Sequence, residues 1–492
     1  MKRNMIRKIS VLAMIFVSII VCCVGCGSGG GGGSTAGSPG NPTVASPSPT
    51  TSPTIQPSPA TWQRCYGGSG NDRCNGVSIS TSISGVRTET AYRLAGLSTS
   101  TDGEVTGNHG GHDFWVVKTD ASGVIISQQC LGGSDNDIPE KLVQTADGGV
   151  IIVGRTNSNN GDVSGNHGGF DIWVVKLNSD DSIAWQKCYG GSGYDSGQAI
   201  AQIDGGYIIA GLTESNDGDA TENHGNQDFW LIKIDETGNI IWQKCYGGTS
   251  SEAAYSCQQC SDGNIIAAGN TSSNNIDVTG NHGNSDFWII KVTENNGTIL
   301  WQKCLGGSNN DNATSIEEKN GQLLIGGTTD SSDGDVAPEF HGGFGPDIWV
   351  MQTDNTASII NWQQVLGGTN DDRLSSFKKI SGSEDYVIAG YVMSRDGNVS
   401  GAHAMYDGWV VKLAQNGELL WQKCWGGSDT DQLIGASSSD EGLTFIGFTK
   451  STDGDILASL NKLTDLGQIA RGPFGDADFW VINTDLDGNI NQ

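Results

Sequence analysis

The chain has 492 residues and a formal net charge of −28 at neutral pH, from 27 basic and 55 acidic side chains. No basic stripe is available to neutralise phosphates, so the charge excludes nucleic acid as a partner and leaves divalent cations and neutral surfaces open. Glycine contributes 73 residues, and no long stretch after residue 60 keeps a helical period. The composition therefore predicts an all-β protein.

The first 25 residues have the pattern of a secretory signal peptide, with four basic residues among the first eight and an apolar run over 9–24. The segment from Cys23 to Cys26 resembles a bacterial lipobox, although Cys23 stands where that motif usually has leucine. The resemblance implies that Cys26 is lipidated and anchors the protein in the cell envelope, at the outer membrane or the cell surface of a bacterium. An uncleaved anchor or ordinary secretion is the alternative.

Residues 26–60 predict a tether. A glycine run reaches residue 33, and a segment rich in serine, threonine and proline follows it to residue 60. Glycine makes such a linker flexible, whereas proline makes it extended and stiffer. The tether would hold the folded part away from the membrane surface.

A unit with one recognisable hairpin recurs along residues 61–492. One copy of the hairpin, Asp228–Gly248, reads DFWLIKIDETGNIIWQKCYGG. It predicts two strands, at 230–234 and 240–246, joined by a tight turn. Two apolar segments, 197–203 and 207–213, precede the hairpin and complete a four-stranded unit. The opening D-x-W occurs seven times, with tryptophan at positions 115, 173, 230, 288, 349, 409 and 480. The chain is therefore a repeat protein with seven units.

Small four-stranded sheets covered on both faces are typical of β-propeller blades. The hairpin pattern K-x-D-x-x-G-x-x-x-W resembles the repeat of pyrroloquinoline-quinone-type propellers, in which it forms the third and fourth strands. The repeats begin with a fourth strand at 62–68 and finish with a third strand at 478–482. We therefore predict a seven-bladed β-propeller over 61–492, closed by the N-terminal strand, which completes the last blade. An open β-solenoid is the alternative.

Oxygen-bearing side chains recur in two loops that antiparallel strands place on one face of the predicted propeller. The connection between units reads G-G-S-x-x-D, and the long loop between the second and third strands reads S-x-D-G-D-V-x-G-N-H-G-x-x-D-x-W. Acids of the D-G-D segment could supply the oxygen ligands that calcium prefers. The candidate calcium ligands are Asp102, Glu104, Asp162, Asp217, Asp219, Asp277, Asp333, Asp335, Asp453 and Asp455.

The same loops favour a second interpretation, a structural hydrogen-bond network. It would join the loop histidine, the aspartate before the tryptophan, a threonine such as Thr213 and the tryptophan itself, and it resembles the His-Asp-Ser/Thr-Trp tetrad of WD-repeat blades. Buried polar groups need such partners. The candidate residues are His109, His167, His224, His282, His341, His403, Asp113, Asp171, Asp228, Asp286, Asp347, Asp407 and Asp478.

Six cysteines share one repeat position, where Val365 stands in the remaining unit, and we expect them to be small buried apolar residues. The pair Cys257 and Cys260 is left open between a local disulfide and free thiols. The six equivalent cysteines are Cys65, Cys130, Cys188, Cys245, Cys304 and Cys424.

The repetition of the acids and histidines argues against catalysis, because an active site is a single asymmetric cluster. We predict a non-enzymatic, surface-exposed, lipid-anchored protein that uses its acidic, loop-rich face for binding or scaffolding. The expected partner is a protein or a polysaccharide outside the cell, with calcium as a candidate cofactor. The alternative is an extracytoplasmic carbohydrate-directed hydrolase that uses the irregular loops 335–347 and 455–478.

Overall fold

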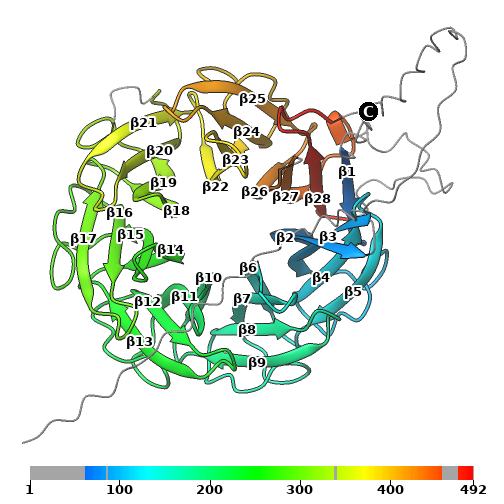
Figure 1. Ribbon diagram of the computed structural model, residues 1–492, viewed down its shortest axis with the longest axis horizontal. Helices are drawn as coiled ribbons and strands as arrows, with labels where there is room; N and C mark the ends of the chain where they lie inside the picture. The colour runs from blue at the N-terminus through cyan, green and yellow to red at the C-terminus, as the bar shows by residue number, and fades with distance from the viewer. Residues whose placement is uncertain (1–60, 85–86, 337–340, 441, 457–474, 491–492) are drawn as a thin grey trace, which may run out of the picture. The chain divides into compact units, whose positions relative to one another are not determined.

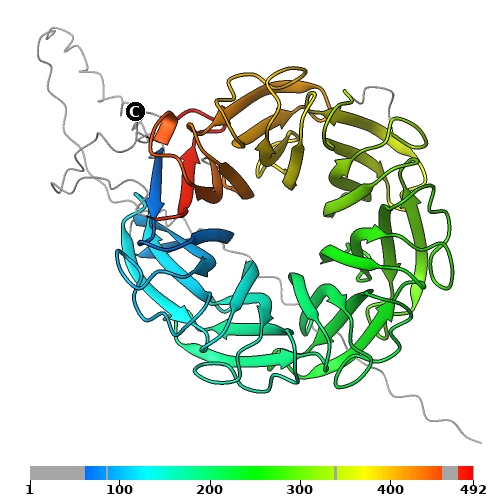
Figure 2. The same ribbon diagram turned by 180° about the vertical axis from the view of Figure 1, so that it is seen from behind.

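The computed structural model describes residues 61–84, 87–336, 341–440, 442–456 and 475–490. Over these residues 28 strands form seven four-stranded antiparallel sheets. The sheets are arranged as the blades of a ring, with their first strands towards the centre and their fourth strands at the periphery (Figure 1; Figure 2 shows the opposite side). The prediction of an all-β, seven-bladed propeller is confirmed. The predicted signal peptide, Cys26 and the tether lie outside the described residues.

Each blade takes four strands in chain order, except the last. Blades 1 and 2 contain β2 (Asp72–Ser84), β3 (Arg87–Ser98), β4 (Asp113–Asp120), β5 (Ile125–Leu131), β6 (Asp137–Gln144), β7 (Val150–Thr156), β8 (Asp171–Leu177) and β9 (Ile183–Tyr189). Blades 3 and 4 contain β10 (Asp195–Ile203), β11 (Gly206–Thr213), β12 (Asp228–Ile234), β13 (Ile240–Tyr246), β14 (Glu252–Gln259), β15 (Ile265–Thr271), β16 (Asp286–Val292) and β17 (Ile299–Leu305).

Blades 5 and 6 contain β18 (Asp311–Lys319), β19 (Gln322–Thr329), β20 (Asp347–Asp354), β21 (Ile360–Leu366), β22 (Asp372–Lys379), β23 (Tyr386–Val392), β24 (Asp407–Leu413) and β25 (Leu419–Trp425). Blade 7 contains β26 (Asp431–Ser438), β27 (Leu443–Thr449), β28 (Asp478–Thr484) and β1 (Trp62–Tyr66). No helix in the described part of the chain is long and apolar enough to cross a membrane.

The two ends of the repeat array meet in blade 7. Strand β1 pairs antiparallel with β28, in a register that places Trp62 opposite Asn483 and Tyr66 opposite Phe479. The N-terminal strand therefore supplies the fourth strand of the last blade, as predicted, and the alternative of an open solenoid is wrong. Closure gives β28 a partner on both sides and leaves no exposed third-strand edge.

The hydrophobic core lies between the blades. Strands β8, β12, β16 and β28 are buried along their whole length, and each of the seven apolar clusters combines residues of two adjacent blades. Each cluster contains one third-strand tryptophan, which no other residue of the cluster exceeds in size. Trp288 of blade 4 packs edge-on against Phe229 of blade 3, with ring centroids 5.3 Å apart. Both faces of every third strand are therefore apolar because both contact a neighbouring blade.

Hydrogen bonds from the outermost strand also join neighbouring blades. On β9, Trp185 donates its indole N–H to the carbonyl of Glu236 at 3.0 Å, and Tyr189 donates its hydroxyl to the carbonyl of Gly238 at 2.6 Å. Both carbonyls belong to the hairpin turn of blade 3. Trp62 and Tyr66 bind the turn of blade 1 in the same way. The W-Q-K-C-Y segment therefore stabilises the contact with the next blade as well as forming an edge.

Every first strand contains a β-bulge after its third residue, a feature that the sequence did not indicate. In blade 3 the register of β10 against β11 shifts between Gly197 and Ala199, and the equivalent shift occurs in all seven blades. A bulge bends its strand and increases the local twist. The innermost strands therefore bend at the same level around the ring.

Candidate functional site

Two sets of connections lie together on one side of the propeller, which we call the loop-rich face. They are the long loops from second to third strands and the short G-G-S-x-x-D connections between blades. In blade 3 they cover residues 214–227 and 190–194. Main-chain hydrogen bonds join them, since Asp219 donates its N–H to the carbonyl of Gly190 at 2.8 Å.

A first buried carboxylate stands at the start of every first strand. In blade 3, Asp195 accepts hydrogen bonds from Thr213, from the Ser215 hydroxyl at 2.8 Å and from the Gly191 N–H at 2.9 Å. The bond from the glycine N–H is present in all seven blades. The seven acids, all fully buried, are Asp72, Asp137, Asp195, Glu252, Asp311, Asp372 and Asp431.

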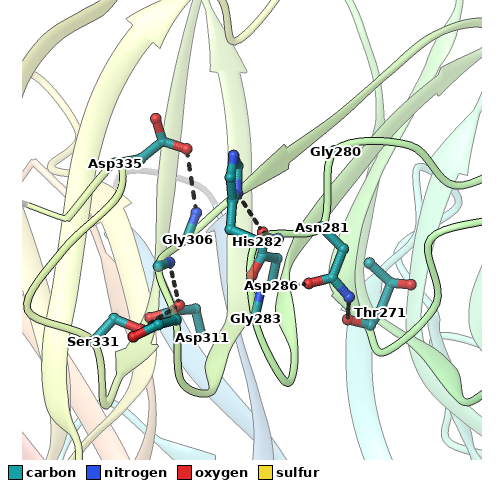
Figure 3. A network of polar contacts seen from close by, with 12 residues as sticks. Thr271, Gly280, Asn281, His282, Gly283, Asp286, Gly306, Asp311, Ser331 and Asp335 are labelled. Carbon is teal, nitrogen blue, oxygen red and sulfur yellow. Dashed lines mark hydrogen bonds and ion pairs between the residues drawn. The ribbon is translucent and has the colours of Figure 1, made fainter.

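A second buried carboxylate stands at the start of every third strand and, in blades 1 to 6, binds the loop histidine. Asp286 accepts hydrogen bonds from the His282 N–H at 2.9 Å and from His282 Nδ1 at 2.7 Å (Figure 3). The corresponding Nδ1–carboxylate distances are 2.7–2.8 Å for His109, His167 and His224, 3.3 Å for His341 and 3.5 Å for His403. The carboxylates of this set are Asp113, Asp171, Asp228, Asp286, Asp347, Asp407 and Asp478.

The predicted four-residue tetrad is wrong in two of its members. Thr213 binds Asp195, the acid of the first set, and the indole of Trp230 donates to the Gln243 side chain at 2.7 Å. The reason is position along the strand: Trp230 lies opposite Cys245 inside the blade, whereas Asp228 lies at the loop end of β12. The glutamine of W-Q serves as the tryptophan's partner in all seven blades.

The D-G-D acids accept hydrogen bonds from the main chain of the neighbouring connection. Asp217 accepts the Ser192 N–H at 2.7 Å, and Asp219 accepts the Gly190 N–H at 3.4 Å. Asn160 and Asn275 occupy the first acidic position in two blades and accept the same bond at 2.8 and 3.0 Å. Because an amide oxygen serves equally well, the loop needs an acceptor there and not a charge.

A calcium site at these loops stays a prediction. The carboxylate oxygens that were expected to bind the ion already hold backbone amides, and blade 5 shows this for Asp335 and Gly306 (Figure 3). Within the described ranges no group of three or more His, Cys, Asp and Glu side chains is arranged to hold a metal ion.

Burial raises the pKa of six aspartates in each set: Asp72, Asp137, Asp195, Asp311, Asp372 and Asp431 in the first, and Asp113, Asp171, Asp228, Asp286, Asp347 and Asp407 in the second. Desolvation is the largest cause for Asp137, Asp171, Asp372 and Asp407, whose pKa reaches about 6, and hydrogen bonds to the same groups offset it in part. The two sets also meet at the blade boundary: a Cβ added to Gly190 would lie 2.7 Å from Asp171 Oδ1 and 2.7 Å from an oxygen of Asp195. Only glycine fits between them.

In six carboxylates of the second set, one of the two oxygens has no hydrogen-bond donor. Oδ1 of Asp113, Asp171, Asp228, Asp286, Asp347 and Asp407 is buried without a partner among the described residues. An unpaired buried oxygen costs about 1–3 kcal/mol. This cost favours the protonated form of the carboxyl group, which agrees with the raised pKa of these residues.

Shallow cavities at the blade boundaries repeat one arrangement. The cavity between blades 2 and 3 measures about 470 Å³ and contains Lys187, which donates to Asn239 at 2.7 Å. The equivalent cavity between blades 6 and 7 measures about 260 Å³ and contains Lys423 bound to Asn489 at 3.0 Å. Both lysines are therefore already hydrogen-bonded to the hairpin of the next blade.

All nine cysteines in the described part of the chain are free thiols. Cys257 and Cys260 are therefore unlinked, which settles the choice between a disulfide and free thiols. The six equivalent cysteines are buried or half-buried beneath the loop-rich face, and burial raises the pKa of their thiols.

The two irregular loops proposed for a hydrolase are described only in part, because 337–340 and 457–474 lie outside the described residues. In the first loop His341 binds Asp347. Phe344, three residues after this histidine, is 94% exposed to solvent. The sequence had marked this loop as irregular but had not indicated the exposed ring.

No protein-family profile matches the sequence. Among curated proteins the chain is similar to the regulatory protein FlaEY of Caulobacter vibrioides, with 24% identity over 208 residues, or 39% of this chain and 21% of that protein. The match thus spans about a fifth of the relative's length.

Solved structures with a similar fold include two propellers. The WD40 propeller domain of Doa1 has a TM-score of 0.43 and 10% identity, over 78% of this chain and 93% of that one. The quinohemoprotein alcohol dehydrogenase of Comamonas testosteroni has a TM-score of 0.42 and 9% identity, over 88% and 77%. These likenesses concern the fold alone, and the protein is a β-propeller repeat protein.

Proposed function

We propose that this protein is a lipid-anchored, extracytoplasmic binding or scaffold protein whose loop-rich face holds a protein or polysaccharide partner outside the cell. The observation that carries the proposal is that the acids and histidines of these loops form hydrogen bonds within the repeats. These side chains bind one another and the main chain, blade after blade. Such a network fixes long loops in place, and rigidly held loops are suited to recognition.

The resemblance of the Cys23–Cys26 segment to a lipobox supports the anchoring part of the proposal, and the tether supports presentation of the propeller away from the membrane. Calcium would assist by binding oxygens of the D-G-D loops from the solvent side. Repetition of the carboxylates and histidines supports a binding role over a catalytic one, since no blade carries the set in a unique arrangement.

The proposal is tested by reversing charge on one face at a time. Full-length protein in detergent is mixed with cell-envelope fragments of the producing bacterium, and bound protein is measured by sedimentation. Glu222→Lys and Asn284→Lys alter exposed positions of the loop-rich face, whereas Glu236→Lys and Asn295→Lys alter exposed hairpin turns of the same two blades. We expect only the first pair to weaken binding. Equal retention by both pairs would contradict the use of the loop-rich face.

A further inference from the structure

The sevenfold pattern of the loop-rich face breaks at several positions together at the boundary between blades 5 and 6. We call it seam 5–6: the connection 367–371 together with the flanking loops 341–346 and 393–406. Val365 stands here where the other seams have cysteine, and Asn398 stands where they have aspartate or glutamate. Both departures fall at the same seam, because Asn398 accepts the Gly367 N–H directly after β21.

Exposed apolar side chains gather at this seam. Ten large apolar residues are exposed over the described ranges, and seven of them lie on the peripheral hairpins. The other three stand on the loop-rich face, on consecutive blades: Ile276 of blade 4, Phe344 of blade 5 and Met405 of blade 6. Phe344 is 94% exposed and Met405 50% exposed, and they belong to the two loops that border the connection 367–371. Exposed apolar groups that cluster in this way mark interaction sites.

Both flanking loops are hydrogen-bonded to the segment 369–371 of the connection. Phe344 donates its N–H to the Thr369 carbonyl at 3.0 Å, and Tyr406 donates its hydroxyl to Asp371 at 2.7 Å. The Tyr406 ring also packs edge-on against Tyr391, with centroids 5.4 Å apart. The hydrogen bonds of Phe344 and of Tyr406, the neighbour of Met405, therefore hold the backbone that displays these two apolar side chains.

A cavity lies beside the connection 367–371. It has a volume of about 390 Å³ and is lined by Thr369, Asn370, Met393, Arg395, Asp396 and Ala404. Arg395 is exposed at its rim and donates one guanidinium N–H to the Ala404 carbonyl at 2.7 Å. The other blades have threonine, asparagine or serine at the position of Arg395. The cavity thus combines apolar walls with a cation that the repeat does not otherwise supply.

The acids around the cavity are already bound. Asp396 accepts the Thr369 N–H at 2.9 Å and its hydroxyl at 3.0 Å, and Asp371 is held by Arg373 at 2.8 Å and by Tyr406. Arg395 forms no ion pair with any residue that the structure describes. An arginine with free N–H groups beside apolar side chains is complementary to a carboxylate that itself adjoins an apolar side chain.

We propose that seam 5–6 docks a protein partner that places an apolar side chain against Met393 and Met405 and an adjacent carboxylate on Arg395. The proposal specifies the partner for the loop-rich face and rests on the proposed function. Aromatic residues, methionine and arginine are the residues enriched in protein interfaces, and methionine adapts to varied peptide side chains. Two of the three methionines within 61–492 stand at this one seam.

The test selects peptide ligands directly, so the natural partner need not be identified. A phage-displayed library of random heptapeptides is selected on the immobilised full-length protein, and the enriched peptides are synthesised and titrated. We expect an apolar residue next to Asp or Glu in the enriched sequences, and at least about tenfold weaker binding to Arg395→Glu, since a charge-assisted contact is replaced by repulsion. Phe344→Ser and Met405→Ser should each weaken the same peptides about threefold or more.

Asn216→Glu provides the matched control, because Asn216 occupies the position of Arg395 in blade 3. Equal binding of the peptides to the protein and to Arg395→Glu, or enrichment of basic peptides, would overturn the proposal. Binding to cell-envelope fragments distinguishes a failure of this proposal from a failure of the proposed function. Weaker binding of Glu222→Lys together with unchanged binding of Arg395→Glu would refute docking at seam 5–6 but would still support binding by the loop-rich face. Arg395-dependent binding of protease-stripped fragments would refute a protein partner in favour of a polysaccharide.

Discussion

The buried carboxylates should make this acidic protein more stable at pH 5 than at pH 7. Asp137, Asp171, Asp372 and Asp407 have a folded-state pKa of about 6, above the ordinary value of 3.8, because burial disfavours their charged form. The folded state therefore binds more protons than the unfolded state between these pH values, and its stability rises as the pH falls through 6.

The magnitude follows from the same values. For one carboxyl group with a pKa of about 6 when folded and 3.8 when unfolded, lowering the pH from 7 to 5 raises the free energy of unfolding by about 1.3 kcal/mol. Four such groups give about 5 kcal/mol when they titrate independently. Carboxylates with a lowered pKa do not oppose this change: Asp147, lowered to about 2 by hydrogen bonds from Thr145 and Lys176, loses its contribution only below about pH 4.

Urea unfolding of the full-length protein at pH 7, 6 and 5, followed by tryptophan fluorescence, measures the effect. Asp137→Asn and Asp372→Asn should each remove about 1.3 kcal/mol of the difference between pH 7 and pH 5, because the amide does not titrate. Asp217→Asn, at an exposed loop position, should leave the difference unchanged. Stability that falls steadily from pH 7 to pH 5 would refute the assignment of raised pKa values to these groups.

Four further predictions concern other parts of the chain. Deleting 62–66 should lower the melting temperature of the whole ring, since β28 loses its outer partner, and an unchanged calorimetric transition would argue against closure. Ile276→Gly should stabilise the protein by about 0.5–1 kcal/mol in urea unfolding, because Ile276 has a φ of +61° where the other six blades have glycine; Gly218→Ile should do the reverse. Cys26→Ser should abolish incorporation of labelled palmitate and release the protein from membranes, whereas retention of the label would contradict lipidation. Titrating calcium into chelator-treated protein should raise the melting temperature saturably if the D-G-D loops bind the ion, and no shift at millimolar calcium would count against it.

Features that depend on period and connectivity could be predicted from the sequence. The third and fourth strands of blade 3 were expected at 230–234 and 240–246, and β12 and β13 occupy Asp228–Ile234 and Ile240–Tyr246. The complementary ends of the chain predicted the pairing of β1 with β28, and antiparallel strands predicted which loops share a face. Each of these inferences needs only the two-residue period of a strand and the short connections between strands.

Side-chain partners could not be predicted in the same way, because a repeat supplies several donors and acceptors at similar levels. Thr213 lies opposite Asp195 on one neighbouring strand and opposite Asp228 on the other, so strand register does not show which carboxylate its hydroxyl binds. The hydroxyl binds Asp195. The β-bulge in each first strand has no signature in residues as varied as Asn75, Glu140 and Tyr255. The role of Trp185 in holding the next blade's turn depends on the approach of two blades, which the sequence of one repeat does not contain.

The two substitutions at seam 5–6 have a common electrostatic consequence. At four other seams the second acid of D-G-D adds to the effect of burial in raising the pKa of the fourth-strand cysteine: Glu104 for Cys65, Asp219 for Cys188, Asp335 for Cys304 and Asp455 for Cys424. Val365 and Asn398 replace both members of such a pair together, so seam 5–6 lacks the carboxylate that lies at this position elsewhere. Asp371 adds an acid at this seam, but Arg373 pairs with it at 2.8 Å. With the acid of position 398 absent and Arg395 added, a partner's carboxylate therefore meets less repulsion beside Asn398 and Arg395 than at the same positions of the other seams. A ring built from seven similar units can therefore bind one acidic partner at one place, because the repeat is broken there in charge as well as in shape.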